Sequence, residues 1–366
     1  MNLSGNHIRI VILLVFVTSI HCGRSQVSLN EFLPDNPAIE YMGRIDFSQP
    51  KSPRFWQPGV SISFRFAGSF CEVILEDEVL WGKSHNYYEL IVDGKARRFQ
   101  MKGLRDSIRI DSDSDAASHS VTICKNSEAN IGYMGLAAIR AERLLPFYES
   151  DNSRPTRSIE CIGNSITCGT GSDQSEIPCG KGLWQDQHNA YFSYGAVTAR
   201  ALNARYHLSA VSGIGLMHSC CNLDITMPDV IDKVSMRDNR IEWDFSKYQP
   251  DVLTISLGQN DGIQDSTQFC DAYLRFIQMM RMHYPNASII CLTSPMADAA
   301  LSGFMRRMLG SIVSKANGNG DAKVYSYFFA RRYNQGCDGH PSLEEHQLIA
   351  GELGKVISDI MKWDIQ

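Results

Sequence analysis

Three residues of the chain have types that suit acyl transfer. Ser165 follows an apolar run and a turn, Asn260 lies in a tight glycine-containing loop, and His340 precedes a proline near the C-terminal end. A serine hydroxyl is a weak nucleophile at neutral pH until a nearby base takes its proton. The tetrahedral intermediate then needs hydrogen-bond donors at its oxyanion. Each residue follows a predicted strand, and carboxyl ends of parallel strands meet at one edge, so a serine esterase site is predicted.

The surrounding motifs resemble the four blocks of the SGNH (GDSL-type) hydrolases. The matching segments are Gly163-Asn-Ser-Ile-Thr167, Ser212-Gly-Ile-Gly-Leu216, Gly258-Gln-Asn-Asp261 and Asp338-Gly-His-Pro341. The resemblance implies that Ser165 attacks the ester and that His340 is the general base. It also implies an oxyanion hole made by the backbone N–H groups of Ser165 and Gly213 and the side chain of Asn260. The chain departs from the commoner pattern at Asn164, where an aspartate usually precedes the serine.

The partner that orients His340 is left open by the sequence. Most of the superfamily carries an aspartate three residues before the histidine, where this chain has Cys337. Asp338 is therefore the candidate third catalytic residue. In the alternative, a backbone carbonyl orients the imidazole and the site works as a Ser–His dyad. We predict the dyad, because side chains of adjacent loop residues point in different directions.

Length and composition favour a two-domain globular protein. The chain has 366 residues, 43% of them hydrophobic and 20% charged, with a formal net charge of −5. The absence of a Lys/Arg block argues against nucleic-acid binding. No cofactor is expected. The segment His218–Cys221 lacks the Cys-x-x-Cys spacing of zinc sites, so no metal is expected either.

The N-terminus has the features of an export signal. Basic residues precede a short apolar core, and small residues follow it, so residues 1–25 are predicted to be a cleaved signal peptide. Lipidation of Cys22 is the alternative. No later segment is long and apolar enough to span a membrane. The expected location is secreted, periplasmic or at the cell surface.

Eleven cysteines in an exported chain predict some disulfides. Cys161, Cys270 and Cys291 lie in apolar patterns and are predicted to be core residues. The cysteines expected in loops near the motifs, and free to pair, are Cys168, Cys179, Cys220, Cys221 and Cys337.

The chain divides at a polar join, residues 151–157. Residues 27–150 contain short alternating segments, including Val60–Phe66 and Cys71–Leu75, and predict a jelly-roll-like β-sandwich. Residues 158–366 alternate strands with helices, which predicts an α/β domain of three layers with a parallel sheet. Its strands are expected at 158–163, 206–212, 251–258, 287–293 and 323–329, and its helices at 190–202, 267–283, 299–315 and 343–361. Ser342 and Glu345 form a predicted capping box at the start of the last helix.

Several further segments resemble the family-2 carbohydrate esterases. They include Tyr41-Met-Gly-Arg44, Trp56-Gln-Pro-Gly59, Ile91-Val-Asp-Gly94, Lys125-Asn-Ser-Glu128 and Asn189-Ala-Tyr-Phe-Ser-Tyr-Gly195. The resemblance covers nearly all of the mature chain. It implies removal of O-acetyl groups from plant polysaccharides such as xylan and glucomannan. The family also tends to lack the usual third triad residue, which agrees with Cys337 in this chain. Three aromatic residues are candidates for stacking on sugar rings: Trp184, Tyr191 and Trp243. Trp184 is the preferred substrate-binding candidate because it lies in the loop-rich insert after Ser165.

Two other functions stay open at this point. A non-catalytic carbohydrate-binding protein on an esterase scaffold would lack at least one of Ser165, Asn260 and His340. A lipolytic or general short-chain esterase would need an apolar acyl groove, and no suitable stretch stands out.

Overall fold

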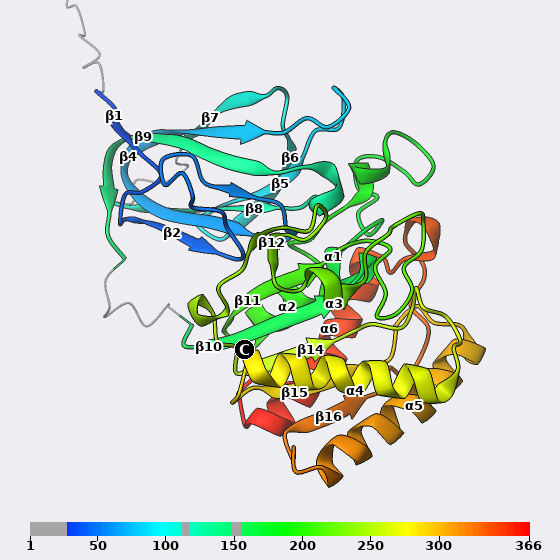
Figure 1. The fold of residues 1–366 in the computed structure, drawn as a ribbon. Coiled ribbons are helices and arrows are strands. Elements are labelled where there is room, and N and C mark those ends of the chain that lie inside the picture. The colour runs from blue at the N-terminus through cyan, green and yellow to red at the C-terminus, as the bar shows by residue number, and fades with distance from the viewer. Residues whose placement is uncertain (1–27, 112–116, 148–154) are drawn as a thin grey trace, which may run out of the picture.

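A computed structural model describes residues 28–111, 117–147 and 155–366 (Figure 1). An antiparallel β part comes first along the chain, and an α/β part follows it. The predicted signal peptide, Cys22 and most of the join at 151–157 lie outside the described residues. Within the described part, no helix has the length and apolar composition needed to cross a membrane.

Over the described residues 28–111 and 117–147, the first part is a nine-stranded antiparallel sheet organised around β4. Its strands are β1 (Asn30–Phe32), β2 (Ile39–Met42), β3 (Arg54–Phe55), β4 (Ser61–Asp77), β5 (Tyr87–Val92), β6 (Lys95–Gln100), β7 (Arg105–Asp111), β8 (His119–Lys125) and β9 (Met134–Leu145). The first half of β4 pairs with β2 and β8, its second half pairs with β7, and β9 pairs with the middle and the second half. The sheet confirms the antiparallel β fold; the jelly-roll arrangement stays a prediction.

Strand β4 corrects one detail of the sequence analysis. The two strands expected at 60–66 and 71–75 are one continuous 17-residue strand. A register shift relative to β9 falls between Ala67 and Cys71. Phe64 and Phe66 before the shift, and Val73 and Leu75 after it, all lie in the same apolar core. The irregularity changes which alternate residues point inward, as a β-bulge does.

The second part is a five-stranded parallel sheet with the order β11-β10-β14-β15-β16. The strands are β10 (Arg157–Gly163), β11 (Ala204–Ala210), β14 (Val252–Ile255), β15 (Ser288–Leu292) and β16 (Val324–Tyr327). The helices are α1 (Ser165–Cys168), α2 (Tyr194–Ala201), α3 (Met227–Val230), α4 (Ser266–His283), α5 (Ala299–Gly318) and α6 (Leu343–Met361). Counted along the chain, the strand order is 2-1-3-4-5. The chain therefore reverses direction across the sheet beside β10, where ligands bind in open α/β sheets.

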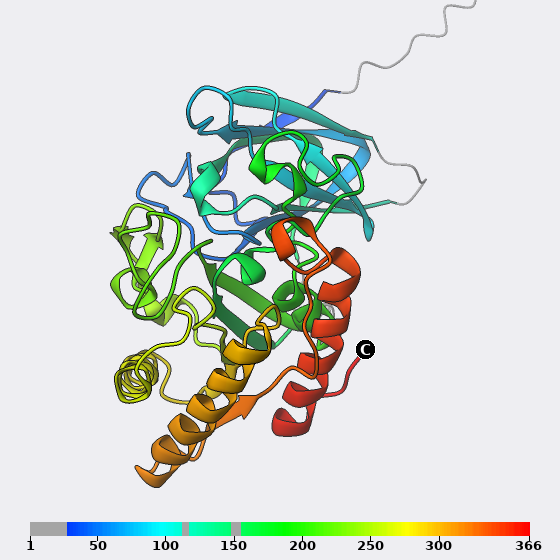
Figure 2. The ribbon, with the colours of Figure 1, turned by 90° about the vertical axis from the view of Figure 1, so that its right-hand side faces the viewer.

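Helices cover both faces of this sheet, which confirms the predicted three layers (Figure 2). Ile289 and Cys291 of β15 pack into a cluster with residues of α4 and α5. Their neighbours Ile290 and Leu292 pack into a second cluster with residues of α2 and α6. A strand buried on both faces accounts for the continuous apolar runs in the sequence.

Helix α2 begins four residues later than predicted. The stretch before it folds as a loop because the first domain supplies its hydrogen bonds. The N–H of Ala190 donates to the carbonyl of Asn126 at 3.2 Å, and the N–H of Tyr191 donates to the Asn126 side chain at 3.1 Å.

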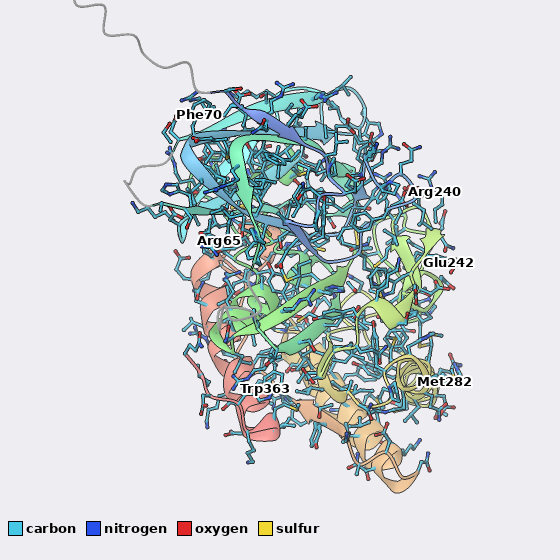
Figure 3. All side chains as sticks on the ribbon, turned by 90° about the vertical axis from the view of Figure 1, so that its left-hand side faces the viewer. Arg65, Phe70, Arg240, Glu242, Met282 and Trp363 are labelled. Atoms are coloured by element: carbon cyan, nitrogen blue, oxygen red, sulfur yellow. A yellow bond between two sulfur atoms is a disulfide. The ribbon has the colours of Figure 1, made fainter. Side chains whose placement is uncertain are left out.

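A small hairpin that the sequence analysis missed lies between the two parts. It consists of β12 (Lys233–Ser235) and β13 (Arg240–Glu242). Val234 is buried in an apolar cluster with Trp56 and Ala129 of the first part. The labelled Arg240 and Glu242 lie on the outside of the molecule in Figure 3 and are exposed. The hairpin thus contributes one face to the domain interface.

A buried ion pair also joins the two parts. Arg44 and Glu160 are 1% and 0% exposed, and Arg44 Nη2 lies 2.8 Å from Glu160 Oε1. Arg44 also donates to the carbonyls of Ile231 and Lys233. Burial alone would raise the pKa of Glu160, but the neighbouring positive charge of Arg44 helps to lower it below its ordinary value. Removal of Arg44 would leave an uncompensated charge in the interior.

We therefore predict that the α/β part is not stable by itself. A truncated chain beginning at Thr156 should be poorly soluble, because Glu160 and the apolar interface lose their partners. A soluble truncated chain with full activity would show that the domains are independent.

In the full chain, Arg44→Met should lower the free energy of unfolding by about 3–5 kcal/mol, the cost of breaking a buried ion pair. Urea unfolding would measure the loss.

Candidate active site

Ser165 lies at the carboxyl end of the central strand β10. It is the first residue of the short helix α1 and is 8% exposed. Gly163, at the end of the strand, has no room for a side chain, because an added Cβ would lie 2.0 Å from Thr167 Oγ1. This close approach lets the chain turn sharply into the helix. The turn presents Ser165 at the topological switch point of the sheet.

Asn164 caps the helix that begins with Ser165. Its side-chain oxygen accepts a hydrogen bond from the N–H of Ile166 at 3.2 Å. Asparagine is as good an N-cap as aspartate, so the departure from the family motif preserves the local geometry. The N–H of Ser165 belongs to the first turn of the helix, where N–H groups have no partner within the helix. It therefore needs an acceptor outside the helix and can serve as a donor beside the serine hydroxyl.

His340 contacts the serine directly, across 175 residues of sequence. Its Nε2 lies 2.9 Å from Ser165 Oγ, and its Nδ1 lies 3.1 Å from the backbone oxygen of Cys337. Because a carbonyl oxygen only accepts, Nδ1 carries the proton in the neutral ring. Nε2 then accepts from the serine hydroxyl, which is the arrangement a general base needs. The capping box at Ser342 and Glu345 starts α6 just after the histidine, as predicted.

Asp338 does not occupy the position of a third triad residue. It lies in a short 3-10 turn, η4 (Cys337–Gly339), with a positive φ of 53°, and its side chain is exposed. The Nδ1 of His340 is instead bound to Cys337, so the structure shows the backbone-carbonyl alternative. The η4 turn explains this difference, because it brings the Cys337 carbonyl under the ring while Asp338 faces solvent. Burial lowers the pKa of the His340 imidazole, and the charge of Asp338 offsets part of this lowering.

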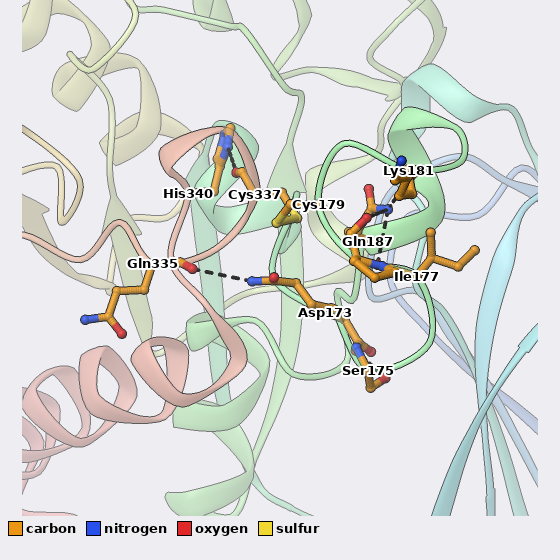
Figure 4. Close-up of a disulfide and its surroundings, with 11 residues drawn as sticks. Asp173, Ser175, Ile177, Cys179, Lys181, Gln187, Gln335, Cys337 and His340 are labelled. Atoms are coloured by element: carbon orange, nitrogen blue, oxygen red, sulfur yellow. Dashed lines mark hydrogen bonds between the residues drawn. A yellow bond between two sulfur atoms is a disulfide. The ribbon is translucent and has the colours of Figure 1, made fainter.

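A disulfide holds the segment that carries this carbonyl (Figure 4). Cys337 is bonded to Cys179, which lies in the insert after the nucleophile, and their Cα atoms are 5.1 Å apart. The N–H of Cys337 also donates to the carbonyl of Gly171 at 2.8 Å. The residue that orients His340 is thus fixed both covalently and by its backbone.

The predicted oxyanion donors come from two further loops. Gly213, with a φ of 83°, follows β11, and Asn260 follows β14. Asn260 Nδ2 donates to the carbonyl of Ile214 at 2.8 Å. One amide hydrogen therefore fixes the side chain against the Gly213 loop. The second hydrogen of the same amide group is left to donate to an oxyanion.

Asp261, a residue to which the sequence analysis gave no role, ties these two loops together. Its carboxylate accepts hydrogen bonds from the N–H groups of Leu216, Met217 and His218 at 2.9, 2.6 and 3.0 Å. Bonds from several backbone donors to one buried carboxylate hold a loop in a single conformation. The sequence feature that could have indicated this role is the acidic residue directly after Asn260 in the motif.

The three aromatic candidates have different surroundings. Trp243 is 8% exposed in the interface cluster and is therefore a core residue. Tyr191 is half-buried, and the Arg200 guanidinium lies 3.9 Å from its ring centre. Trp184 is 44% exposed, and its ring meets His188 edge-on at a centroid distance of 4.4 Å. Trp184 thus presents part of its side chain to solvent.

Trp184 also belongs to the same region as the catalytic pair. It lies in the 3-10 turn η2 (Trp184–Gln187), in the insert that Cys179 ties to the histidine loop. Burial and then the charge of His340 lower the pKa of His188 far below its ordinary value. His188 therefore lies within electrostatic reach of His340, and Trp184 packs against His188.

The cysteines near His218 pair with each other. Cys220 and Cys221 form a disulfide, so they do not offer two thiolates to a metal. Among the described residues, no group of three metal-ligating side chains is suitably placed. Cys168, which the sequence analysis left free to pair, is a buried thiol.

One buried residue near the site comes from the first domain. Glu128, in the segment that resembles the family-2 esterases, accepts a hydrogen bond from the N–H of Ser212 at 2.8 Å. The sequence analysis quoted this segment without giving Glu128 a role. Its partner is 84 residues away, which no sequence pattern reveals.

Comparison with known proteins agrees with this geometry. Residues 41–147 match the family model described as carbohydrate esterase 2 N-terminal, and residues 161–348 match the GDSL-like lipase/acylhydrolase family. The structure of a family two carbohydrate esterase from Clostridium thermocellum, solved with cellohexaose, is 30% identical. It superposes with a TM-score of 0.80 over 89% of this chain and 99% of that one. The chain belongs to the family 2 carbohydrate esterases.

Two curated relatives of this carbohydrate esterase differ in how much of their own length this chain covers. The cellulase/esterase CelE of Acetivibrio thermocellus is 32% identical over 347 residues, which is 90% of this chain but 40% of CelE. An acetylxylan esterase/glucomannan deacetylase of Cellvibrio japonicus is 26% identical and is covered over 92% of both chains. The chain thus spans less than half of CelE.

We predict that this carbohydrate esterase depends on His340 far more than on Asp338. His340→Ala should be nearly inactive, because it removes the base that contacts Ser165. Asp338→Ala should lose less than about tenfold in kcat, since loss of a true triad aspartate costs on the order of ten-thousandfold. Initial rates on p-nitrophenyl acetate would measure both. A ten-thousandfold loss in Asp338→Ala would establish a triad.

The pH dependence of the esterase should follow His340. Burial lowers the pKa of His340 below 6.5, although the Cys337 carbonyl and the charge of Asp338 partly offset this. The base must be neutral, so the acidic limb of kcat/KM should have its midpoint below pH 6.5, the ordinary pKa of histidine. Asp338→Ala should move this midpoint to still lower pH. A midpoint above pH 6.5 would contradict the assignment.

Proposed function

We propose that this chain is a serine esterase that removes O-acetyl groups from plant cell-wall polysaccharides such as xylan and glucomannan. The observation that carries the proposal is the 2.9 Å contact between Ser165 Oγ and His340 Nε2. The names of the relatives support the substrate class, because one is an acetylxylan esterase/glucomannan deacetylase.

The first half-reaction would acylate Ser165. His340 Nε2 takes the hydroxyl proton as Ser165 Oγ attacks the acetyl carbonyl carbon. The oxygen becomes an oxyanion that accepts hydrogen bonds from the N–H groups of Ser165 and Gly213 and from Asn260 Nδ2. The C–O bond to the sugar then breaks, His340 returns the proton to the sugar oxygen, and acetyl-Ser165 remains.

The second half-reaction would release acetate. His340 takes a proton from water, whose oxygen attacks the acetyl-serine carbonyl. The same donors stabilise the second oxyanion. The serine oxygen leaves, takes back the proton, and the site is restored. No metal or cofactor enters either step.

Trp184 is the proposed contact for the sugar. Its exposed ring lies on the insert that the Cys179–Cys337 disulfide ties to His340. A partly exposed aromatic ring suits stacking on a pyranose. We also propose that the protein acts outside the cytoplasm, because the disulfide needs an oxidising compartment and the N-terminal sequence resembles an export signal.

The decisive experiment measures acetate release from acetylated xylan and glucomannan. Wild type should release acetate, and Ser165→Ala should lose nearly all activity while keeping its melting temperature, because only the nucleophilic oxygen is deleted. Activity should also fall steeply from p-nitrophenyl acetate to longer acyl esters.

The alternatives predict different results. A non-catalytic carbohydrate-binding protein would bind the polysaccharide and release no acetate. A lipolytic enzyme would prefer the long acyl chains. More than a few per cent residual activity in Ser165→Ala would remove Ser165 as the nucleophile.

A further inference from the structure

Glu128 is a buried carboxyl group that the proposed mechanism does not use. It belongs to the first domain, just before the 3-10 turn η1 (Ala129–Ile131), and is 0% exposed. Its Oε2 accepts a hydrogen bond from the N–H of Ser212, in the second domain, at 2.8 Å. A carboxyl group is costly to bury, so its place at the domain interface calls for an explanation.

The contact fixes the residue directly before an oxyanion donor. Gly213 follows Ser212, and the peptide bond between them carries the N–H assigned to the oxyanion hole. Each of three consecutive residues in this loop forms a backbone hydrogen bond with a residue elsewhere in the chain. Glu128 binds the N–H of Ser212, the N–H of Cys220 donates to the carbonyl of Gly213 at 2.8 Å, and Asn260 binds the carbonyl of Ile214.

We infer that Glu128 is a positioning residue through which the first domain sets the oxyanion hole of the second. The inference rests on the proposed function, since it assigns a role within the same site. Glu128 does not touch the substrate. It acts by holding Ser212, so that the N–H of Gly213 points to the developing oxyanion.

Neighbouring residues of the first domain hold Glu128 in place. The buried Lys125 Nζ donates to the backbone carbonyls of Ser127 and Glu128 at 2.7 and 3.0 Å. Asn126, in the same segment, binds the N–H groups of Ala190 and Tyr191. One segment of four residues thus contacts both the loop before α2 and the loop after β11.

The charge of Glu128 is compatible with this place. A negative carboxylate beside an oxyanion hole would oppose the transition state. Burial raises the pKa of Glu128 to about 7, although hydrogen bonds with Ser212 partly offset the effect. Both the ionised and the protonated carboxyl group accept a hydrogen bond from the N–H of Ser212. The inference therefore requires the side chain to reach Ser212 and does not require a charge.

Three substitutions of Glu128 in the full chain separate reach from charge. Glu128→Gln keeps the length and an acceptor oxygen, so kcat on p-nitrophenyl acetate should stay within about threefold of wild type. Glu128→Asp keeps the carboxyl group but withdraws it by about 1.5 Å, one bond length. Glu128→Ala removes it. Both should lower kcat by about a hundredfold, the scale of a 1 Å misplacement, with KM changed less than about threefold.

Glu160→Asp is the matched control. Glu160 is also a buried interface carboxylate, at 0% exposure, and accepts a hydrogen bond from Arg44 Nη2 at 2.8 Å. The same shortening there should lower the melting temperature and leave kcat unchanged. If Glu128→Ala does not fold, the comparison of the Gln and Asp variants carries the test.

Two results would overturn the inference. One is an unchanged kcat in folded Glu128→Asp; the other is a loss in Glu128→Gln as large as in Glu128→Asp. Wild type serves to separate this inference from the proposed function. If wild type is inactive, the proposed function itself fails, whereas an active wild type with an unaffected Asp variant rejects only the role of Glu128.

Discussion

The 2.9 Å contact between Ser165 and His340 is the constraint on which the rest of the site depends. The two residues come from opposite ends of the α/β domain, after the first strand and before the last helix. Their separation must be held to a few tenths of an ångström, because proton transfer requires hydrogen-bond distance. The parallel sheet meets this demand by placing strand ends at one edge. Capped helices and a disulfide then fix each loop.

The histidine shows how a backbone group replaces a side chain. A carbonyl orients an imidazole as well as a carboxylate does, but it stabilises the imidazolium less because it carries no full charge. The Cys179–Cys337 disulfide and the bond to Gly171 hold that carbonyl in place. In the proposed mechanism, this rigid turn and the nearby charge of Asp338 take the place of the aspartate of a triad.

The first domain is closely bound to the catalytic domain by polar contacts. The Arg44–Glu160 ion pair, the Asn126 contacts and the Glu128–Ser212 hydrogen bond all cross the interface. The Arg44–Glu160 and Glu128–Ser212 contacts are fully buried, so breaking either leaves an unsatisfied charge or hydrogen-bonding group. Such contacts specify one relative position of the domains. An apolar interface by itself would tolerate small shifts.

The sequence by itself determined the two-part organisation, the parallel sheet, the motif residues and the start of α6 at Ser342. These features rest on local periodicity, turn chemistry and capping, which short segments encode. It also predicted that a backbone carbonyl would hold His340, because Cys337 offers no carboxylate. Only the tertiary structure decided the rest. The continuous β4 strand, the late start of α2, the cysteine pairing and the position of Glu128 depend on contacts between residues far apart in the chain, whose distances no local pattern contains.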